Sequence, residues 1–425
     1  MGRRQDTVAV LAGQYAARFR ETLRPLRMIG REAEFPLVYP DGRAGDVFRL
    51  WEPLLAKGGF EARYDDPQTR TVIVALTGAG GTIEVEVGRA TVELVLGPYE
   101  DLWQLAEGTH RLLRQVAEVA HEVGMRVLGF GIQPRTRPSA ALMTPKRRYR
   151  YLAQAAGEAW WHFTTTASDQ VHVDITRAEI ADAVNTLNLL SAPLIALTAN
   201  SSVYAGRPGH YLSGREGLLG ALGADRAGMT PRAFVSVEEF VAYICHYPCY
   251  VLRRGGGFRE YNRPFTEYLR RHGPDIDAYL WHEHYTWNSA RPRAHTSTME
   301  IRPACQQPHD ASLVVAALGL GWVEALGELR GFLADAVTDP WAALRQYRRA
   351  AIVQGLRATE PVKGFVEEVL RIAERGLRQR GRSEESFLEP LWRRLDQRTT
   401  PGDLARGIMR SKGMAALIDA ASYQL

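Results

Sequence analysis

The spacing of apolar residues along the chain predicts strands alternating with helices, followed by a helical C-terminal part. In several segments apolar positions recur every three or four residues, as on one face of a helix. These segments are 5–23, 48–58, 101–123, 147–159, 179–198 and 237–247. From residue 311 the same spacing continues to the end of the chain. We therefore expect a mostly helical region beyond residue 311.

Other segments carry apolar residues at alternate positions or in short runs, which is typical of strands. They are 26–39, 71–76, 82–96, 126–134, 170–175 and 297–302. The glycines at 78–81 predict a hairpin turn, and the Gly- and Arg-rich segments 200–233 and 253–263 predict long loops. No internal repeat or low-complexity linker interrupts this order. It predicts one α+β domain over residues 1–425, built on one main sheet.

Composition is that of an ordinary globular protein, with 45% hydrophobic and 24% charged residues among 425. The net charge of +5 is small for this length and favours anionic small substrates over nucleic acid. Cys245, Cys249 and Cys305 fit neither a disulfide framework nor a zinc cluster, so we expect reduced, mostly buried thiols. We see no secretory signal and no apolar run of about 18 residues. These features predict a cytoplasmic protein with no membrane partner.

Acidic residues stand at alternate positions on the predicted strands. Glu32 and Glu34 are two residues apart, so their side chains point to one face of a strand. Glu84 and Glu86 share a face in the same way. Glu93 lies at an odd spacing from them and joins that face only if a turn or bulge falls near Gly88.

His172, Glu300 and Arg302 add to this pattern, the last two being two residues apart in TMEIRP. A buried carboxylate is costly unless it is paired or binds a cation. Several carboxylates with one neutral imidazole suit hard divalent ions, and an adjacent Arg can clamp a phosphate. Each pair alone also fits a solvated strand face, which acidic residues usually occupy. Strand alternation therefore leaves both the metal site and the solvated face open.

Six motifs in one order resemble those of the glutamate–cysteine ligases of plants and many bacteria, from about Arg27 to the C-terminus. They are MIGREAEFPLV, IEVEVGRATVELVLGPYEDLWQL, VLGFGIQPR with TPKRRYRYL, ASDQVHVDI, LTANSSVYAGRPGHYLSGREG and HTSTMEIRPAC. The resemblance implies a glutamine synthetase-like fold with a curved, mainly antiparallel sheet flanked by helices. It also implies an ATP- and Mg-dependent ligase that joins the side-chain carboxylate of glutamate to the amine of cysteine through an acyl phosphate.

The resemblance further implies roles for individual residues. Six ligands would hold two or three Mg²⁺ ions around the ATP phosphates: Glu32, Glu34, Glu86, Glu93, His172 and Glu300. The residues that contact phosphate would be Arg302, as a catalytic residue, and Lys146, for which a solvated position is an equal alternative. Glutamate would be held by Arg148, Ser168 and Arg215, and Tyr250 would line the acceptor pocket.

Some positions depart from the family pattern. Arg31 and Ala33 replace a small residue and a His, His172 stands where plant members have Asn, and the spacing from Glu86 to Glu93 is one residue longer. Ligase chemistry remains the expectation, whereas the identity of the amine stays open.

A ligase of the same fold with another acid or amine is the first alternative. A basic nucleic-acid-binding protein is a second, which the Arg-rich loops do not favour because they lack interleaved aromatic residues. The complete ligand set argues against a non-catalytic relative. We expect small-molecule partners and a monomer or homodimer.

Overall fold

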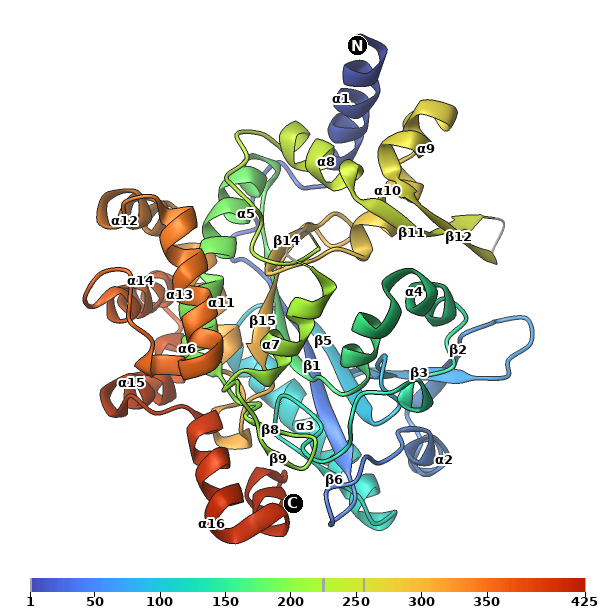
Figure 1. Ribbon diagram of the computed structural model, residues 1–425, viewed down its shortest axis with the longest axis vertical. Coiled ribbons are helices and arrows are strands. Elements are labelled where there is room, and N and C mark those ends of the chain that lie inside the picture. The colour runs from blue at the N-terminus through green and yellow to red at the C-terminus, as the bar shows by residue number, and fades with distance from the viewer. Residues whose placement is uncertain (1, 224–225, 255–256, 425) are drawn as a thin grey trace.

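The computed structural model describes residues 2–223, 226–254 and 257–424, and a nine-stranded antiparallel sheet runs through its centre (Figure 1). The strand order is β14-β15-β7-β1-β5-β4-β3-β2, with β6 paired to β1. The bounds are β1 (Ile29–Val38), β2 (Phe60–Tyr64), β3 (Ile73–Gly78), β4 (Gly81–Val85), β5 (Thr91–Tyr99), β6 (Arg126–Val127), β7 (Ser168–Asp174), β14 (Ala290–Arg293) and β15 (Thr298–Cys305). The central strands β1, β5, β7 and β15 come from distant parts of the chain.

One face of this sheet is apolar and is covered by helices. Its side chains include Leu94 on β5, Val171 on β7 and Ile301 on β15, all buried. Helix α3 (Leu102–Glu122) packs on β5 and β1, and helix α11 (Val314–Glu324) packs on β7. Since successive side chains of a strand point to opposite faces, the acidic residues of the same strands are left on the other face.

A buried ion pair lies within the apolar face. Arg31 of β1 donates two hydrogen bonds to Asp169 of β7, at 2.7 and 2.8 Å, and both side chains are fully buried. Arg31 also donates to the carbonyl oxygen of Ser312, at 2.6 Å. Because all the charge is paired and hydrogen-bonded, the pair is tolerated in the core and joins β1, β7 and the start of α11.

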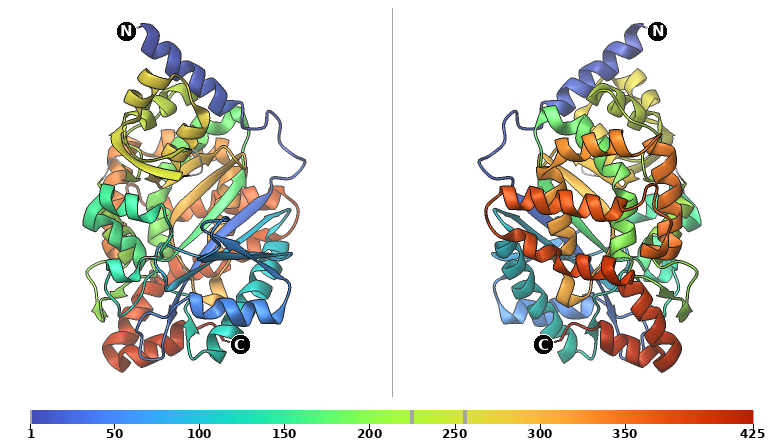
Figure 2. Two further views of the ribbon diagram at one scale, coloured as in Figure 1. Left: turned by 90° about the vertical axis from the view of Figure 1, so that its right-hand side faces the viewer. Right: turned by 90° about the vertical axis from the view of Figure 1, so that its left-hand side faces the viewer.

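The C-terminal third of the chain is helical, as predicted, and covers one side of the molecule (Figure 2). After α11 come α12 (Leu326–Ala336), α13 (Pro340–Gln354), α14 (Phe365–Gln379), α15 (Glu389–Gln397) and α16 (Pro401–Ala421). Helices α11 and α14 approach closely at Gly321, where an added Cβ would lie 2.3 Å from the carbonyl oxygen of Ala373. The indole of Trp322 donates across the same contact to the Val369 carbonyl, at 2.9 Å.

The remaining elements surround the acidic face and one end of the molecule. Helix α1 (Gly2–Ala16) packs with α8 (Val237–His246), α9 (Phe265–His272) and α10 (Ile276–His284) at the top of Figure 1. The other elements are α2 (Phe48–Lys57), α4 (Tyr149–Ala156), the 3-10 helix η2 (Gly157–Thr164), α5 (Ile180–Leu189), α6 (Ser191–Thr198), β8 (Val203–Tyr204), β9 (Arg207–Pro208), α7 (Gly214–Leu219), β10 (Ala227–Gly228), β11 (Pro248–Arg254), β12 (Gly257–Pro264) and β13 (Trp287–Asn288).

Two segments predicted as single strands are organised differently. Residues 82–96 form the two strands β4 and β5, joined by a turn at residues 86–90. In segment 126–134 only β6 is a strand. Its glycines bring the backbone against neighbouring segments: a Cβ on Gly129 would lie 2.7 Å from the Gln307 carbonyl oxygen, and one on Gly131 would lie 2.6 Å from Cβ of Cys305. Such close packing replaces strand pairing and leaves little trace in the hydrophobic pattern.

Both predicted long loops contain regular structure. Segment 253–263 is largely the hairpin β11–β12, except for residues 255–256, which lie outside the described part of the chain. Segment 200–233 contains β8, β9, α7 and β10, with residues 224–225 likewise outside the description. The prediction of buried, free cysteines is confirmed for all three. Within the described residues, no single helix combines the length and the apolar composition of a membrane span, and two bent helix pairs meet both criteria only when each pair is taken together.

Candidate active site

Strand register gathers the acidic residues into rows on the face of the sheet opposite α3 and α11. Glu34 of β1 lies opposite Glu93 of β5, which in turn lies opposite Glu84 of β4. In a second row, His172 of β7 lies opposite Glu300 of β15. The alternation that suggested a shared face is therefore confirmed for these strands.

The first carboxylate cluster is formed by Glu34, Glu86 and Glu93, whose nearest oxygens lie within 4.8 Å of one another. Glu34 accepts hydrogen bonds from the Ser168 backbone N–H at 2.7 Å and from the Gln170 amide at 2.9 Å. Burial, followed by the charge of Glu86, raises the pKa of Glu34 to about 7. Burial and the neighbouring glutamates also raise the pKa of Glu93 well above its usual value. A cation would relieve the repulsion that these shifts record.

The turn between β4 and β5 brings Glu86 to this cluster. The Thr91 backbone N–H donates to the carbonyl of Gly88 at 2.9 Å, which closes the turn near the predicted position. From the next segment, Thr144 Oγ1 donates to the Glu86 carbonyl and Lys146 Nζ to the Val85 carbonyl, both at 2.6 Å. The turn is thus held from outside the sheet, and Glu86 and Glu93 reach the same side.

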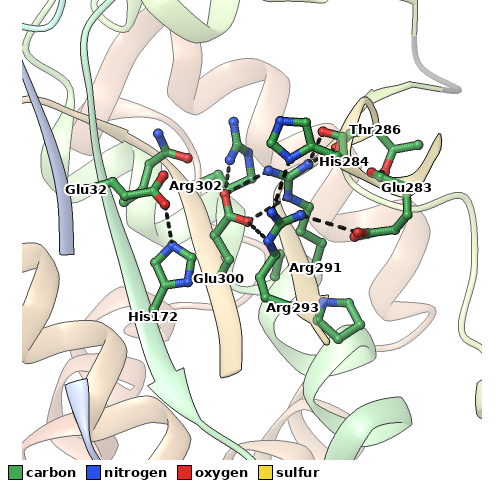
Figure 3. Close-up of polar contacts among 12 residues, drawn as sticks. Glu32, His172, Glu283, His284, Thr286, Arg291, Arg293, Glu300 and Arg302 are labelled. Atoms are coloured by element: carbon green, nitrogen blue, oxygen red, sulfur yellow. Dashed lines mark hydrogen bonds and ion pairs between the residues drawn. The ribbon is translucent and has the colours of Figure 1, made fainter. Parts of the chain in front are cut away.

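The second cluster is formed by Glu32, His172 and Glu300 (Figure 3). Nε2 of His172 lies 3.2 Å from Glu32. Burial alone would raise the pKa of Glu32, but the proximity of His172 and Arg302 outweighs burial and lowers the pKa to about 2. Glu32 is therefore ionised, and an imidazole and two carboxylates share one small volume.

Three arginines surround Glu300 (Figure 3). Arg291 donates to both of its oxygens, at 2.7 and 3.1 Å, and to the carbonyls of His284 and Thr286, each at 2.7 Å. Arg293 lies 3.2 Å from the same carboxylate, and Arg302 also contacts it. This carboxylate accepts hydrogen bonds from Arg291 and Arg302 and forms an ion pair with Arg293, so it links the acidic clusters to a wall of arginines.

The first cluster, Glu32 of the second cluster and several arginines border a cavity of about 280 Å³, whereas His172 and Glu300 lie outside its lining. Its acidic side is lined by Glu32, Glu34, Glu84, Glu86 and Glu93, and its basic side by Arg148, Arg215, Arg291 and Arg302. Three rings close one end: Trp160 lies 5.0 Å from Phe163 and 6.0 Å from Trp287, measured between ring centroids. The arrangement suits a polyanion bridged by cations on one side and held by guanidinium groups on the other.

The other predicted residues lie at different distances from this cavity. The Nε atoms of Arg148 and Arg215 are buried and have no hydrogen-bond partner among the residues that the structure describes, so both side chains retain donors for a ligand. Ser168 is fully buried at the edge of the first cluster. The Tyr250 ring lies 3.8 Å below the guanidinium of Arg226, outside the set of lining residues.

Lys146 is also outside the lining residues of the cavity, since its ammonium group donates to a backbone carbonyl. Burial, followed by the charge of Arg148, lowers its pKa to about 8. In this position the side chain supports the β4–β5 turn, and contact with phosphate stays a prediction.

Sequence reasoning did not single out several residues of the site. They are Gln170, Arg291, Arg293, His284, Tyr149, Tyr285, Trp160, Phe163 and Trp287. One signal was present: Arg291 and Arg293 alternate on the strand that precedes TMEIRP, as Glu300 and Arg302 do. The aromatic residues carry no such signal, because aromatic positions in helical segments are usually core.

The donor set fits magnesium. Carboxylate oxygens are the preferred ligands of this ion, and the first cluster offers three carboxylates that have no arginine partner among the described residues. In the second cluster an imidazole joins two carboxylates. Each of the two clusters therefore offers a set of donors to a divalent ion.

Comparison with known proteins identifies the family. The model of glutamate-cysteine ligase family 2 (GCS2) matches residues 28–416, which is most of the chain. The chain belongs to this family. The sequence is 28% identical to the chloroplastic glutamate–cysteine ligase of Brassica juncea over 78% of this chain and 67% of that enzyme. It is 28% identical to the Arabidopsis thaliana enzyme over 74% of this chain and 63% of that enzyme. The chain therefore spans about two thirds of the length of these relatives.

Solved structures agree in fold with this family assignment. The glutamate–cysteine ligase of Francisella tularensis, solved in complex with AMP, aligns over 95% of this chain and 88% of that one, with a TM-score of 0.54 and 13% identity. A bifunctional glutathione synthetase from Pasteurella multocida aligns over 97% of this chain and 52% of that one, with a TM-score of 0.50 and 14% identity. The predicted glutamine synthetase-like α+β fold is confirmed. As a member of the GCS2 family, the chain is an ATP-dependent ligase.

One expectation is corrected by the same comparison. The predicted cytoplasmic location is wrong, because the curated relatives of this chain are named as chloroplastic enzymes. The prediction rested on the lack of a secretory signal and of a long apolar run. Neither feature distinguishes the cytoplasm from other aqueous compartments.

Proposed function

We propose that this chain uses ATP and Mg²⁺ to join the side-chain carboxylate of glutamate to the amine of cysteine. The observation that carries the proposal is the pairing of two carboxylate clusters with a wall of arginines across one cavity. Carboxylates alone would suit many metal sites, and arginines alone would suit any anion. Together they suit a nucleotide triphosphate and an amino acid that meet at the γ-phosphate.

Magnesium bound by the glutamates and His172 would neutralise the phosphates and polarise the phosphorus–oxygen bond. The chain's own residues orient and stabilise the reacting groups. Arg302 lies against Glu300 and lines the cavity together with Glu32. A guanidinium at that point stabilises charge on the equatorial oxygens during transfer.

The reaction proceeds in two steps. A carboxylate oxygen of glutamate attacks the γ-phosphorus, the bond to the β-phosphate oxygen breaks, and ADP leaves. The amine nitrogen of cysteine then attacks the acyl carbon, inorganic phosphate leaves, and the amine proton passes to a base. Arg148 and Arg215 would hold the carboxylates of glutamate, since each has a buried Nε without a partner in the described part of the chain.

The aromatic end of the cavity would protect the acyl phosphate. Trp160, Phe163 and Trp287 form a continuous apolar wall, with centroids 5.0 to 6.0 Å apart. An acyl phosphate is consumed by water unless water is excluded, and closed apolar surfaces exclude it. The wall therefore favours attack by the amine over hydrolysis.

The test is ADP release by the purified protein with Mg²⁺, ATP and glutamate, with and without cysteine, followed by mass spectrometry of the products. The expected result is cysteine-dependent ADP release and the mass of γ-glutamylcysteine. If ADP release depends on glutamate but no γ-glutamylcysteine forms, and another proteinogenic amino acid gives a ligated mass, that amino acid is the acceptor in place of cysteine. If ATP is not turned over with any of these amino acids, the proposal is refuted.

A further inference from the structure

One histidine at the border of the cavity is held in a single tautomer. His284 is the last residue of α10 and its Nδ1 lies 3.2 Å from an N–H group of Arg293 (Figure 3). A guanidinium has only donors, so Nδ1 must be the acceptor in this contact. In the neutral ring the proton then resides on Nε2.

The surroundings of His284 keep the ring neutral. Burial lowers its pKa well below the usual value, and the charges of Arg293, Arg291, Arg148 and Arg302 lower it further. A second proton would have to be added to Nδ1, which already faces a guanidinium. Nε2 already carries a proton and therefore cannot accept one. The neutral ring remains a hydrogen-bond donor through the physiological pH range.

The Nε2–H group has no acceptor within the described part of the protein. The ring lines the cavity together with Arg302, and Figure 3 shows the dashed contact of the ring with Arg293, which leaves Nε2 as the ring nitrogen outside this contact. Arg302 keeps one donor nitrogen on Glu300, so an oxygen of a ligand in the cavity can accept from a second nitrogen of Arg302 and from Nε2–H of His284.

We propose that Nε2–H of His284 donates a hydrogen bond to an oxygen of the phosphoryl group while that group is transferred to glutamate. His284 would thus be a catalytic residue that contacts the reacting group beside Arg302. This inference rests on the proposed function, since it assigns the anion to the γ-phosphoryl group of ATP.

A neutral donor is well suited to this place. Four arginines already surround the ring. A fifth cation would bind the phosphates of ATP and ADP as tightly as it binds the transition state, and it would therefore slow product release without lowering the barrier. A fixed N–H dipole adds stabilisation where charge builds up on the oxygen and needs no reorganisation. Arg293, through its contact with Nδ1, acts as a positioning residue for the ring.

Two substitutions separate the two ring nitrogens. His284→Gln can place an amide N–H at the position of Nε2 and so keeps the donor to the cavity. His284→Asn can place its oxygen at the position of Nδ1 and so keeps the contact with Arg293 while losing the donor. We expect His284→Asn to lower kcat about 100-fold, as loss of one such donor does, with the KM for glutamate changed less than about threefold. His284→Gln should retain kcat to within about tenfold of the parent chain.

The outcomes are distinct. Unchanged kcat in His284→Asn, or equal losses in both variants, would overturn the proposal, because the donor at Nε2 would then have no role of its own. A raised KM for glutamate with unchanged kcat would place the donor on a substrate carboxylate instead and would likewise overturn it.

A second measurement does not depend on ligation. Long-range ¹H–¹⁵N NMR of histidine-labelled protein, assigned with His284→Gln, should show protonated Nε2 and bare Nδ1. Binding of MgADP with aluminium fluoride, a mimic of a transferring phosphoryl group, should weaken in His284→Asn and persist in His284→Gln. A proton on Nδ1, or equal binding by both variants and the parent, would refute the inference. Absence of γ-glutamylcysteine from the parent chain would instead count against the proposed function.

Discussion

Glu93 stands between two other carboxylates with no arginine beside it among the described residues, which makes the first cluster a place of concentrated negative charge. Its pKa is raised by burial and then by Glu86, Glu32 and Glu34. For an acid with a raised pKa, the folded state binds more protons than the unfolded state. Stability is therefore lost as pH rises above the usual value of 4.5.

Replacement of this charge should stabilise the metal-free protein. We expect Glu93→Gln to raise the free energy of unfolding at about pH 8 by about 1 kcal/mol or more, because one unit of pKa shift corresponds to about 1.4 kcal/mol. Ligation should be abolished because a metal ligand is lost. Urea denaturation without Mg²⁺ and ADP release measure the two effects.

Glu84 provides the matched control for this substitution. It lies opposite Glu93 in the same row of the sheet, but it pairs with Arg63, whose side chain is 54% exposed. Glu84→Gln should leave the free energy of unfolding nearly unchanged, because exposed ion pairs contribute about 0–1 kcal/mol. If both substitutions stabilise the protein equally, the repulsion does not reside in the first cluster.

His282 offers a test of pH dependence away from the cavity. It is 1% exposed, stacks on Phe265 at 4.8 Å and has one ring nitrogen 2.8 Å from the Ile244 carbonyl. Burial lowers its pKa to about 3, so the unfolded chain takes up a proton at higher pH than the folded chain does. Its contribution to stability is thus complete above about pH 6.5 and is lost as pH falls toward about 3.

We expect His282→Gln, which keeps the N–H donor, to reduce the loss of stability between about pH 7 and pH 5 by about 1–2 kcal/mol. Urea denaturation at both pH values gives the difference. The exposed His295 is the control, and His295→Gln should leave the pH dependence unchanged. An identical pH dependence in the parent and in His282→Gln would contradict the burial of a neutral ring.

At the scale of elements, the turn between β4 and β5 decides whether Glu86 reaches the first cluster. Gly88 lies against η2, where an added Cβ would be 2.1 Å from the carbonyl oxygen of Thr164. A methyl group there must move the backbone of the turn or of η2. Since Thr144 and Lys146 hold the carbonyls that flank this turn, such a shift would be transmitted to Glu86.

We expect Gly88→Ala to raise the Mg²⁺ concentration needed for half-maximal activity by about tenfold, which corresponds to about 1.4 kcal/mol. A magnesium titration of ADP release measures this. Gly80→Ala, in the turn between β3 and β4, is the control, because the three atoms nearest to an added Cβ there all belong to the side chain of Arg111, at 3.5 to 3.9 Å. Equal magnesium requirements in the two variants would show that the turn does not set the position of Glu86.

The elements also show where sequence reasoning succeeded. Alternation correctly placed Glu32 with Glu34 on one strand face, and it stated the condition under which Glu93 joins Glu84 and Glu86. It failed in segment 126–134, where close backbone contacts at Gly129 and Gly131 replace strand pairing. The hairpin β11–β12 was missed because glycines and arginines dominate its composition, and its strands have little apolar alternation.

At the scale of the whole molecule, the site is assembled by strands that are far apart in the chain. Glu34, Glu93, His172 and Glu300 lie on β1, β5, β7 and β15, and only the strand order of the sheet makes them neighbours. Local patterns identify each strand but not this order. The resemblance to a family supplied the set of candidate ligands, whereas the arginines around Glu300 and the aromatic wall emerged only from the structure.

Metal binding should therefore stabilise the entire fold. We expect Mg²⁺ at about 100 times its dissociation constant to add about 2.7 kcal/mol to the free energy of unfolding. Thermal denaturation with Mg²⁺ and with EDTA measures the shift in Tm, and Glu86→Gln should lack most of it. A Tm that is indifferent to Mg²⁺ in the parent protein would contradict the assignment of the clusters as metal sites.

The aromatic wall has an optical consequence. Two of its three rings are indoles, Trp160 and Trp287, whose centroids lie 6.0 Å apart with an angle of 54° between the planes. Chromophores at this separation and inclination couple their electronic transitions and produce a paired signal of opposite signs in circular dichroism. This signal would change when a ligand shifts either indole, so that ligand entry can be followed in the unlabelled protein before any bond is made.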